Sequence, residues 1–167
     1  MEQTKPTRLI VGITGATGTV FGVRLLQMLH GSGVETHLVV SKWAARTLAH
    51  ETPHSLKDVQ SLATKSYGIG DNLIHRAADV ILKERRKLVL VVRESPFSEI
   101  HLENMLKLAR MGVIILPPVP AFYNHPQNLD DMINHITMRV IDQFDIHLDV
   151  MNRWDGVLLD RRRSETE

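Results

Sequence analysis

Residues Leu9 to Gly22, with the sequence LIVGITGATGTVFG, decide the fold of this chain. The stretch starts with an apolar run typical of a buried strand and continues with three glycines spaced G-x-x-G-x-x-G. Apolar residues at helical spacing follow as far as Leu29. The pattern predicts a strand, a tight turn and a helix, which is the first unit of an α/β protein.

The glycine turn is also a candidate phosphate-binding loop. Glycine tolerates positive φ and lets a ligand approach the backbone, and the first turn of a helix offers unpaired N–H groups and a positive dipole end. We therefore predict that the loop binds a phosphate. The alternative is that the glycines only turn the strand sharply into the helix.

The surroundings of the loop favour a mononucleotide over a dinucleotide. A T-G-A-T-G opening in dinucleotide oxidoreductases usually has its next glycine three residues on, where this chain has Phe21. The second expected strand, residues 35–40, ends in Ser41 without the carboxylate that holds a ribose. Neither Tyr67 nor Tyr123 has a lysine four residues later. NAD is therefore disfavoured, and a mononucleotide such as FMN is favoured.

Composition limits the class of protein. A chain of 167 residues suits one domain, which we place at residues 1–154, with a charged tail at residues 155–167. The formal net charge of +1 implies no bulk attraction to nucleic acid or membrane. The short polar start lacks the apolar core of a signal peptide, so we expect a cytoplasmic protein. The chain has no cysteine, which excludes thiol catalysis and cysteine-ligated metals.

The nine histidines do not form a recognisable metal motif. His50 and His54 have the spacing of a helical metal pair, but Pro53 between them breaks the helix that would align them. We therefore expect no bound metal.

The order of elements is unusual in the middle of the chain. Apolar runs predict further strands at residues 87–92 and 113–116, whereas residues 41–86 contain helical patterns and no segment typical of a strand. Strands and helices normally alternate with short connections in a parallel sheet. We therefore expect that a segment is missing between Tyr67 and Gly68.

Polar and aromatic side chains follow the expected strands directly. They are found in the glycine loop, at Ser41, at Arg93 and Glu94, and at Phe122 and Tyr123. Ligands of open parallel sheets bind outside the carboxyl ends of the strands. These loops are therefore expected to converge on one binding site.

Three basic residues on helices are further candidates. Arg76 and Lys83 share a helical face with Asp79 between them, and Arg139 has Asp142 within one turn. Taken alone, Arg76 and Lys83 are better explained as a solvated face with an internal ion pair. They could bind a second phosphate if the fold brings them together.

Several longer strings resemble one family. They are GITGATG, the Ser41-Lys42 strand end, NLIHRAADVILKE at residues 72–84, RESP at 93–96, IHLENML at 100–106 and PAFY at 120–123. Over nearly the whole chain to Trp154, the sequence closely resembles the UbiX family of flavin prenyltransferases, which includes one of the component proteins of phenolic (hydroxyarylic) acid decarboxylase systems. The resemblance implies an α/β, Rossmann-like, three-layer flavoprotein fold with a mainly parallel sheet.

The resemblance also implies an activity. Family members join a dimethylallyl group from dimethylallyl phosphate to reduced FMN without a metal, and a partner UbiD-type decarboxylase uses the product. They are homo-oligomers, and the family suggests a dodecamer.

The same resemblance assigns roles to individual residues. Gly15, Ala16, Thr17, Ser41 and Arg76 are expected to hold FMN, and Arg76 with Lys83, Arg93, Tyr123 and Arg139 to surround the allylic phosphate. Cations suit a leaving group on which charge develops. Glu94 is expected to move protons, and Lys83 to act beside it. The ring of Trp154 is expected to stabilise an allylic cation.

The chain departs from the family after Tyr67, where members carry a Ser-Gly-Ser segment, a further strand beside the first one, and a Cys-Ser turn. A true deletion and an incomplete sequence both explain their absence. If the deletion is real, the alternative function is an FMN-binding or assembly protein without transferase activity.

Overall fold

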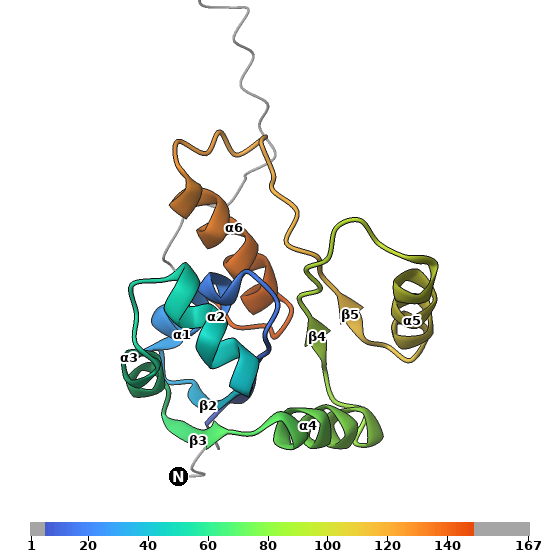
Figure 1. The fold of residues 1–167 in the computed structure, drawn as a ribbon, viewed down its shortest axis with the longest axis horizontal. Coiled ribbons are helices and arrows are strands. Elements are labelled where there is room, and N and C mark those ends of the chain that lie inside the picture. The colour runs from blue at the N-terminus through green and yellow to red at the C-terminus, as the bar shows by residue number, and fades with distance from the viewer. Residues whose placement is uncertain (1–5, 149–167) are drawn as a thin grey trace, which may run out of the picture.

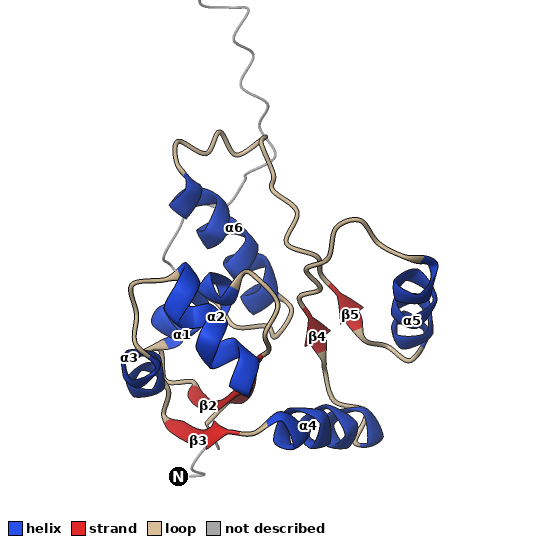
Figure 2. Cartoon of the chain, viewed as in Figure 1, coloured by secondary structure: helices blue, strands red, loops and turns tan. Residues whose placement is uncertain are grey.

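The computed structural model describes residues 6–148, which form an α/β fold (Figures 1 and 2). Its strands are β1 (Arg8–Ile13), β2 (Glu35–Val40), β3 (Lys65–Ile69), β4 (Val89–Leu90) and β5 (Ile114–Ile115). Its helices are α1 (Thr19–Leu29), α2 (Lys42–Glu51), α3 (Leu56–Leu62), α4 (Asp71–Lys83), α5 (Glu99–Arg110) and α6 (Leu129–Asp142). The predicted tail at residues 155–167 lies outside the described residues. No helix in the described part is long and apolar enough to cross a membrane.

All the strand pairs are parallel, but they form two separate sheets. One sheet has the order β1-β2-β3 and the other pairs β4 with β5. β1 and β2 run in register from Arg8 opposite Glu35 to Ile13 opposite Val40. The α/β class and the parallel pairing are confirmed. Figure 1 shows β4, β5 and α5 beside the body formed by α1, α2, α3 and α6.

The core lies between the three-stranded sheet and its helices. α1 packs against β1 and α6, and the side chains of Leu26, Leu38 and Ile141 are fully buried there. Burial of one such side chain stabilises a fold by about 1.5–3 kcal/mol. Arg24 of α1 holds α6 in place through an ion pair with Asp130 (Nη2 to Oδ1, 2.7 Å).

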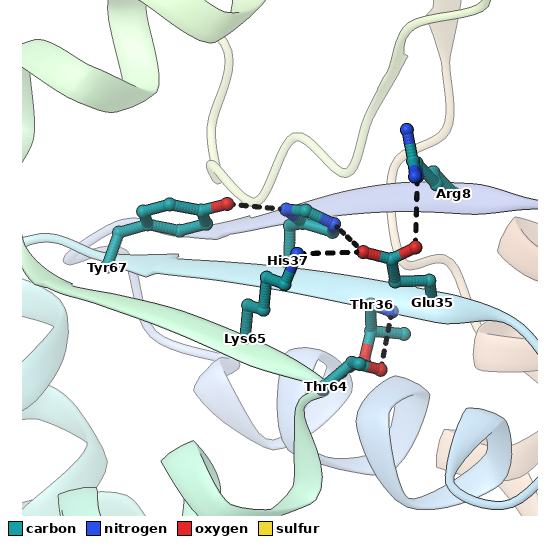
Figure 3. Close-up of polar contacts among 7 residues, drawn as sticks. All are labelled: Arg8, Glu35, Thr36, His37, Thr64, Lys65 and Tyr67. Carbon is teal, nitrogen blue, oxygen red and sulfur yellow. Dashed lines mark hydrogen bonds and ion pairs between the residues drawn. The ribbon is translucent and has the colours of Figure 1, made fainter.

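The prediction of a strandless crossing from residue 41 to 86 is wrong, because β3 lies within it and pairs with β2. β3 was not recognised because its sequence, KSYGI, has no apolar run and four of its five residues are exposed. Side chains help to hold it: the Tyr67 hydroxyl lies 2.7 Å from His37 Nδ1, and Lys65 Nζ lies 3.2 Å from Glu35 Oε1 (Figure 3). The junction between Tyr67 and Gly68 thus falls inside this strand.

The second sheet is shorter than the sequence predicts. β4 and β5 have two residues each, although apolar runs predicted strands at 87–92 and 113–116. Helices α4 and α5 contain no buried residue in the part of the chain that the structure describes. Apolar side chains on α5 are therefore exposed, including Ile100, Leu102 and Leu106.

Candidate functional site

The loop between β1 and α1 has the geometry of an anion-binding turn. Gly18 caps the helix with φ 100°, a left-handed conformation that favours glycine. Among the described residues, the backbone N–H groups of Gly15, Ala16 and Thr17 make no hydrogen bond. Three consecutive free donors beside a helix N-terminus suit a phosphate.

Gly15 has a structural role as well. A Cβ atom there would lie 2.4 Å from Cβ of Trp43 on α2, closer than real Cβ contacts allow. The close approach of α2 to the loop therefore requires glycine at this position whether or not a ligand binds.

A carboxylate already occupies the end of this site that is nearest to α1. Glu51 Oε2, from the last turn of α2, accepts hydrogen bonds from Gly18 N (2.9 Å), Thr19 N (3.1 Å) and Thr19 Oγ1 (3.0 Å). Burial alone would raise the pKa of Glu51, but the hydrogen bonds from Thr17, Gly18 and Thr19 outweigh burial and hold the pKa below its usual value. The sequence gives no signal for this role of Glu51, because nothing in a helix end 33 residues away marks it as the cap of α1.

A cavity of about 170 Å³ adjoins the loop. Ala16 and Thr17 line it together with Arg93, which follows β4, and with side chains of β1 and α6. The structure therefore brings the glycine loop and Arg93 to one cavity, as predicted. The volume is below the roughly 300–1,000 Å³ typical of small-molecule sites.

Ser41 lies beside the loop at the carboxyl end of β2. It is buried, its N–H donates to the Ile13 carbonyl (2.9 Å), and its Oγ accepts from Ala44 N (2.9 Å) as the N-cap of α2. The hydroxyl hydrogen remains able to donate to a ligand.

Arg76 and Lys83 form an ion-paired face on α4. Asp79 Oδ2 lies 2.9 Å from Arg76 Nη1 and 3.1 Å from Lys83 Nζ. Hydrogen bonding to Lys83, assisted by the charge of both cations, lowers the pKa of Asp79. All three side chains are about half exposed or more, so the solvated ion-pair interpretation describes this surface.

Tyr123, in the loop before α6, and Arg139, on α6, both lie near His135 of α6. The rings of Tyr123 and His135 meet edge-on with centroids 5.9 Å apart, and Asn124 Nδ2 lies 2.6 Å from His135 Nδ1. Burial, and then the positive charge of Arg139, lower the pKa of His135. No motif in the sequence marks His135 as part of this group.

Of the remaining predicted residues, Glu94 and Trp154, the structure describes only Glu94. Glu94 is exposed, and its Oε1 accepts a hydrogen bond from Ser95 N (3.0 Å). Trp154 lies outside the described residues. The described ranges contain no group of three or more His, Asp or Glu side chains that could hold a metal ion.

A parallel α/β fold with a glycine loop after its first strand is shared by nucleotide-binding proteins. A family model described as Flavoprotein matches residues 58–141, about half of the chain.

Comparison with characterised proteins narrows this class. The chain is 50% identical to a probable UbiX-like flavin prenyltransferase of Bacillus subtilis, over 90% of each chain. The dodecameric FMN-dependent Ubix-like decarboxylase from Escherichia coli O157:H7 superposes with a TM-score of 0.86 at 47% identity, covering 90% of this chain and 100% of that one. AnUbiX (PadA1), in complex with FMN and dimethylallyl pyrophosphate, gives a TM-score of 0.88 at 39% identity, covering 92% and 100%. The chain therefore belongs to the UbiX-like flavin prenyltransferase family.

The alignment also bears on the missing segment. It runs over 184 positions, whereas 90% of this 167-residue chain is about 150 residues, so about 34 positions of the Bacillus subtilis relative have no counterpart here. The expected internal deletion is supported by this difference.

Proposed function

We propose that the chain is a flavin prenyltransferase that joins the dimethylallyl group of dimethylallyl phosphate to reduced FMN, without a metal. The observation that carries the proposal is the 50% identity to a relative of this name over 90% of the chain. AnUbiX was solved with FMN and the dimethylallyl diphosphate. The product would serve a UbiD-type aromatic acid decarboxylase.

The phosphate of FMN is assigned to the free N–H groups of Gly15, Ala16 and Thr17. Ser41 adds a hydroxyl donor from the neighbouring strand end, and Arg76 is the candidate cation at the cofactor. When bound, the reduced flavin supplies the nucleophilic N5 and C6 atoms. Because Glu51 neutralises the dipole end of α1, the phosphate is held by the loop rather than by the helix terminus.

The allylic phosphate is assigned to Arg76, Lys83, Arg93, Tyr123 and Arg139. A cation near a departing phosphate stabilises the charge that develops on it. Only Arg93 lines the loop cavity in this structure, whereas Arg76 and Lys83 are paired with Asp79. Binding of the phosphate therefore requires that these two side chains exchange Asp79 for the ligand.

Glu94 is assigned the proton transfers at N5 and on the phosphate, and Lys83 acts beside it. The Glu94 side chain is exposed, and one of its carboxylate oxygens accepts a hydrogen bond from a backbone N–H. The second oxygen is therefore available to a ligand. Trp154 is assigned to the allylic cation, which the face of an indole ring stabilises.

We also propose that the protein is a cytoplasmic homo-oligomer, a dodecamer as in the Escherichia coli relative. Leu102 and Leu106, which are exposed and four residues apart on α5, support this, because exposed apolar surface marks protein interfaces.

A second candidate function is FMN binding or assembly without transfer. It is supported by the two separate sheets and by the positions of the Bacillus subtilis relative that have no counterpart in this chain. A chain whose sheet is interrupted could bind FMN or assemble with partners without catalysing transfer.

Mass spectrometry of the flavin after incubation with reduced FMN and dimethylallyl phosphate distinguishes the two functions. A transferase adds the mass of one dimethylallyl group to the flavin, and a binding protein leaves FMN unchanged. Glu94→Gln should lower the rate about a hundredfold or more while FMN binding persists. Glu103→Gln, an exposed glutamate on α5, is the matched control and should leave the rate unchanged.

A further inference from the structure

Thr47 of α2 holds one peptide group of the glycine loop. Its hydroxyl donates to the carbonyl oxygen of Gly15 (Oγ1 to O, 3.1 Å), which lies 32 positions earlier in the chain. The Thr47 side chain is partly buried at this contact. Within residues 6–148, no other group donates to the Gly15 carbonyl. The orientation of the peptide between Gly15 and Ala16 therefore depends on Thr47.

A second carbonyl lies near the same hydroxyl. Thr47 Oγ1 is 3.0 Å from the carbonyl oxygen of Trp43. That carbonyl lies inside α2, four residues before Thr47, so it already accepts the helical N–H of Thr47. A threonine hydroxyl has only one hydrogen to donate. The Gly15 carbonyl, which has no helical partner, needs that hydrogen more than the Trp43 carbonyl does.

The contact with Thr47 also sets the direction of an N–H group. The Gly15–Ala16 peptide bond is trans, so its C=O and its N–H point in opposite directions. A carbonyl that is held toward α2 therefore turns the Ala16 N–H away from α2. Ala16 lines the cavity beside the loop, and no residue of α2 is among the described residues that line it. The Ala16 N–H is thus directed to the cavity side of the loop.

Glycine at position 15 makes this restraint necessary. The close approach of Trp43 requires glycine there, and glycine restricts its own backbone less than any other residue does. The same freedom would let the Gly15–Ala16 peptide rotate, so that its carbonyl oxygen and not its N–H faced the cavity. A carbonyl oxygen repels a phosphate. A hydrogen bond that holds the carbonyl on the α2 side prevents this arrangement.

We propose that Thr47 is a positioning residue for the phosphate of FMN. It holds the Gly15 carbonyl against α2 and so presents the Ala16 N–H as a ready-oriented phosphate donor. The inference rests on the proposed function, which assigns the phosphate to this loop. Thr47 does not line the cavity and acts only through the peptide that it holds. Its effect is therefore confined to flavins that carry a phosphate, because an oriented donor needs no ordering when the anion binds.

Fluorescence titration of Thr47→Val with FMN and, separately, with riboflavin tests the proposal. Valine keeps the shape and the branched Cβ of threonine but has no hydroxyl. The affinity for FMN should fall about tenfold, which corresponds to the loss of one hydrogen bond to a charged group. The affinity for riboflavin should not change. Thr47→Ser, which restores the hydroxyl, should recover the preference of the parent for FMN.

A matched control comes from the other end of the same helix. The Thr52 hydroxyl donates to the Leu48 carbonyl (3.0 Å) at the end of α2 and makes no contact with the glycine loop. Thr52→Val removes a hydroxyl in the same way and should leave the ratio of FMN to riboflavin affinity at the parent value. Thr47→Ala also lacks the hydroxyl but favours the helix, and should lose the ratio as Thr47→Val does. Urea unfolding of each variant shows that it is folded.

The amide proton of Ala16 provides a direct readout by NMR. A hydrogen bond to phosphate moves an amide proton downfield. Addition of FMN should shift this proton in the parent and in Thr47→Ser, and should shift it less in Thr47→Val.

Three results would overturn the proposal. An FMN preference in Thr47→Val equal to that of the parent would show that the hydroxyl does not orient the donor. An equal loss of affinity for both flavins would show that Thr47 only stabilises the fold. A loss of the ratio in Thr52→Val as large as in Thr47→Val would show that the effect is not specific to the loop. Failure of the proposed phosphate site itself has a different signature, because the parent would then bind FMN and riboflavin equally.

Discussion

Replacing Glu51 with glutamine should destabilise the fold by weakening the cap of α1. The carboxylate accepts three hydrogen bonds from Gly18 and Thr19, and it lies at the positive end of the helix dipole. Glutamine retains one acceptor oxygen but loses the charge. Hydrogen bonds to charged groups contribute about 1.5–3 kcal/mol, and a charge at a helix terminus about 0.3–1 kcal/mol. Because the side chain is partly exposed, we expect a net loss of about 1–2 kcal/mol.

Urea unfolding of the parent and the variant at two pH values measures this loss. The folded pKa of Glu51 is lowered, so its stabilisation is complete above the unfolded value of 4.5 and is lost as pH falls through the folded value. The difference between parent and variant should therefore be largest at pH 7 and smaller at pH 4. Glu103→Gln should change stability by less than about 0.5 kcal/mol at both pH values. Equal stability of parent and Glu51→Gln at pH 7 would refute the capping role.

Other changes have expected outcomes that follow from single contacts. Leu26→Ala, in the fully buried centre of α1, should cost about 2–5 kcal/mol in urea unfolding, whereas Leu129→Ala at the exposed start of α6 should cost little. Asn128→Ala should cost about 1 kcal/mol, because the side chain caps α6 by accepting from Asp131 N, and Asn128→Ser should recover most of it. Hydrogen bonds from Arg8, and then from His37 and Lys65, lower the pKa of Glu35 to about 2. The melting temperature of Glu35→Gln should therefore fall below that of the parent at pH 6 and approach it between pH 4.5 and pH 2.

Local sequence signals predicted the elements whose formation depends on local chemistry. The glycine loop, the α1 pattern and the apolar run of β2 all appear where expected. Ser55 and Asp58, three positions apart in the sequence, form a capping box at the start of α3. In these elements, propensity, capping and burial favour the same structure.

The features that were missed depend on distant partners. β3 has no apolar pattern, and its pairing with β2 is supported by Tyr67 and Lys65 contacts to residues 30 positions earlier in the chain. The apolar run at residues 87–92 does not indicate that β4 and β5 form a sheet separate from β1, β2 and β3. The reason is that strand pairing depends on a neighbouring strand as well as on an apolar sequence. The capping role of Glu51 likewise depends on its contact with the backbone N–H of Gly18, which is distant in the sequence.

Titration of the protein with FMN and, separately, with riboflavin tests the central claim most directly. The two flavins differ only in the phosphate, so a ligand comparison avoids the packing defect that any side chain at Gly15 would cause against Trp43. If the free N–H groups of Gly15 to Thr17 bind the phosphate, FMN should bind at least tenfold more tightly than riboflavin, a difference of about 1.4 kcal/mol or more. Equal affinities for the two flavins would show that the loop is not a phosphate site, and would contradict the account.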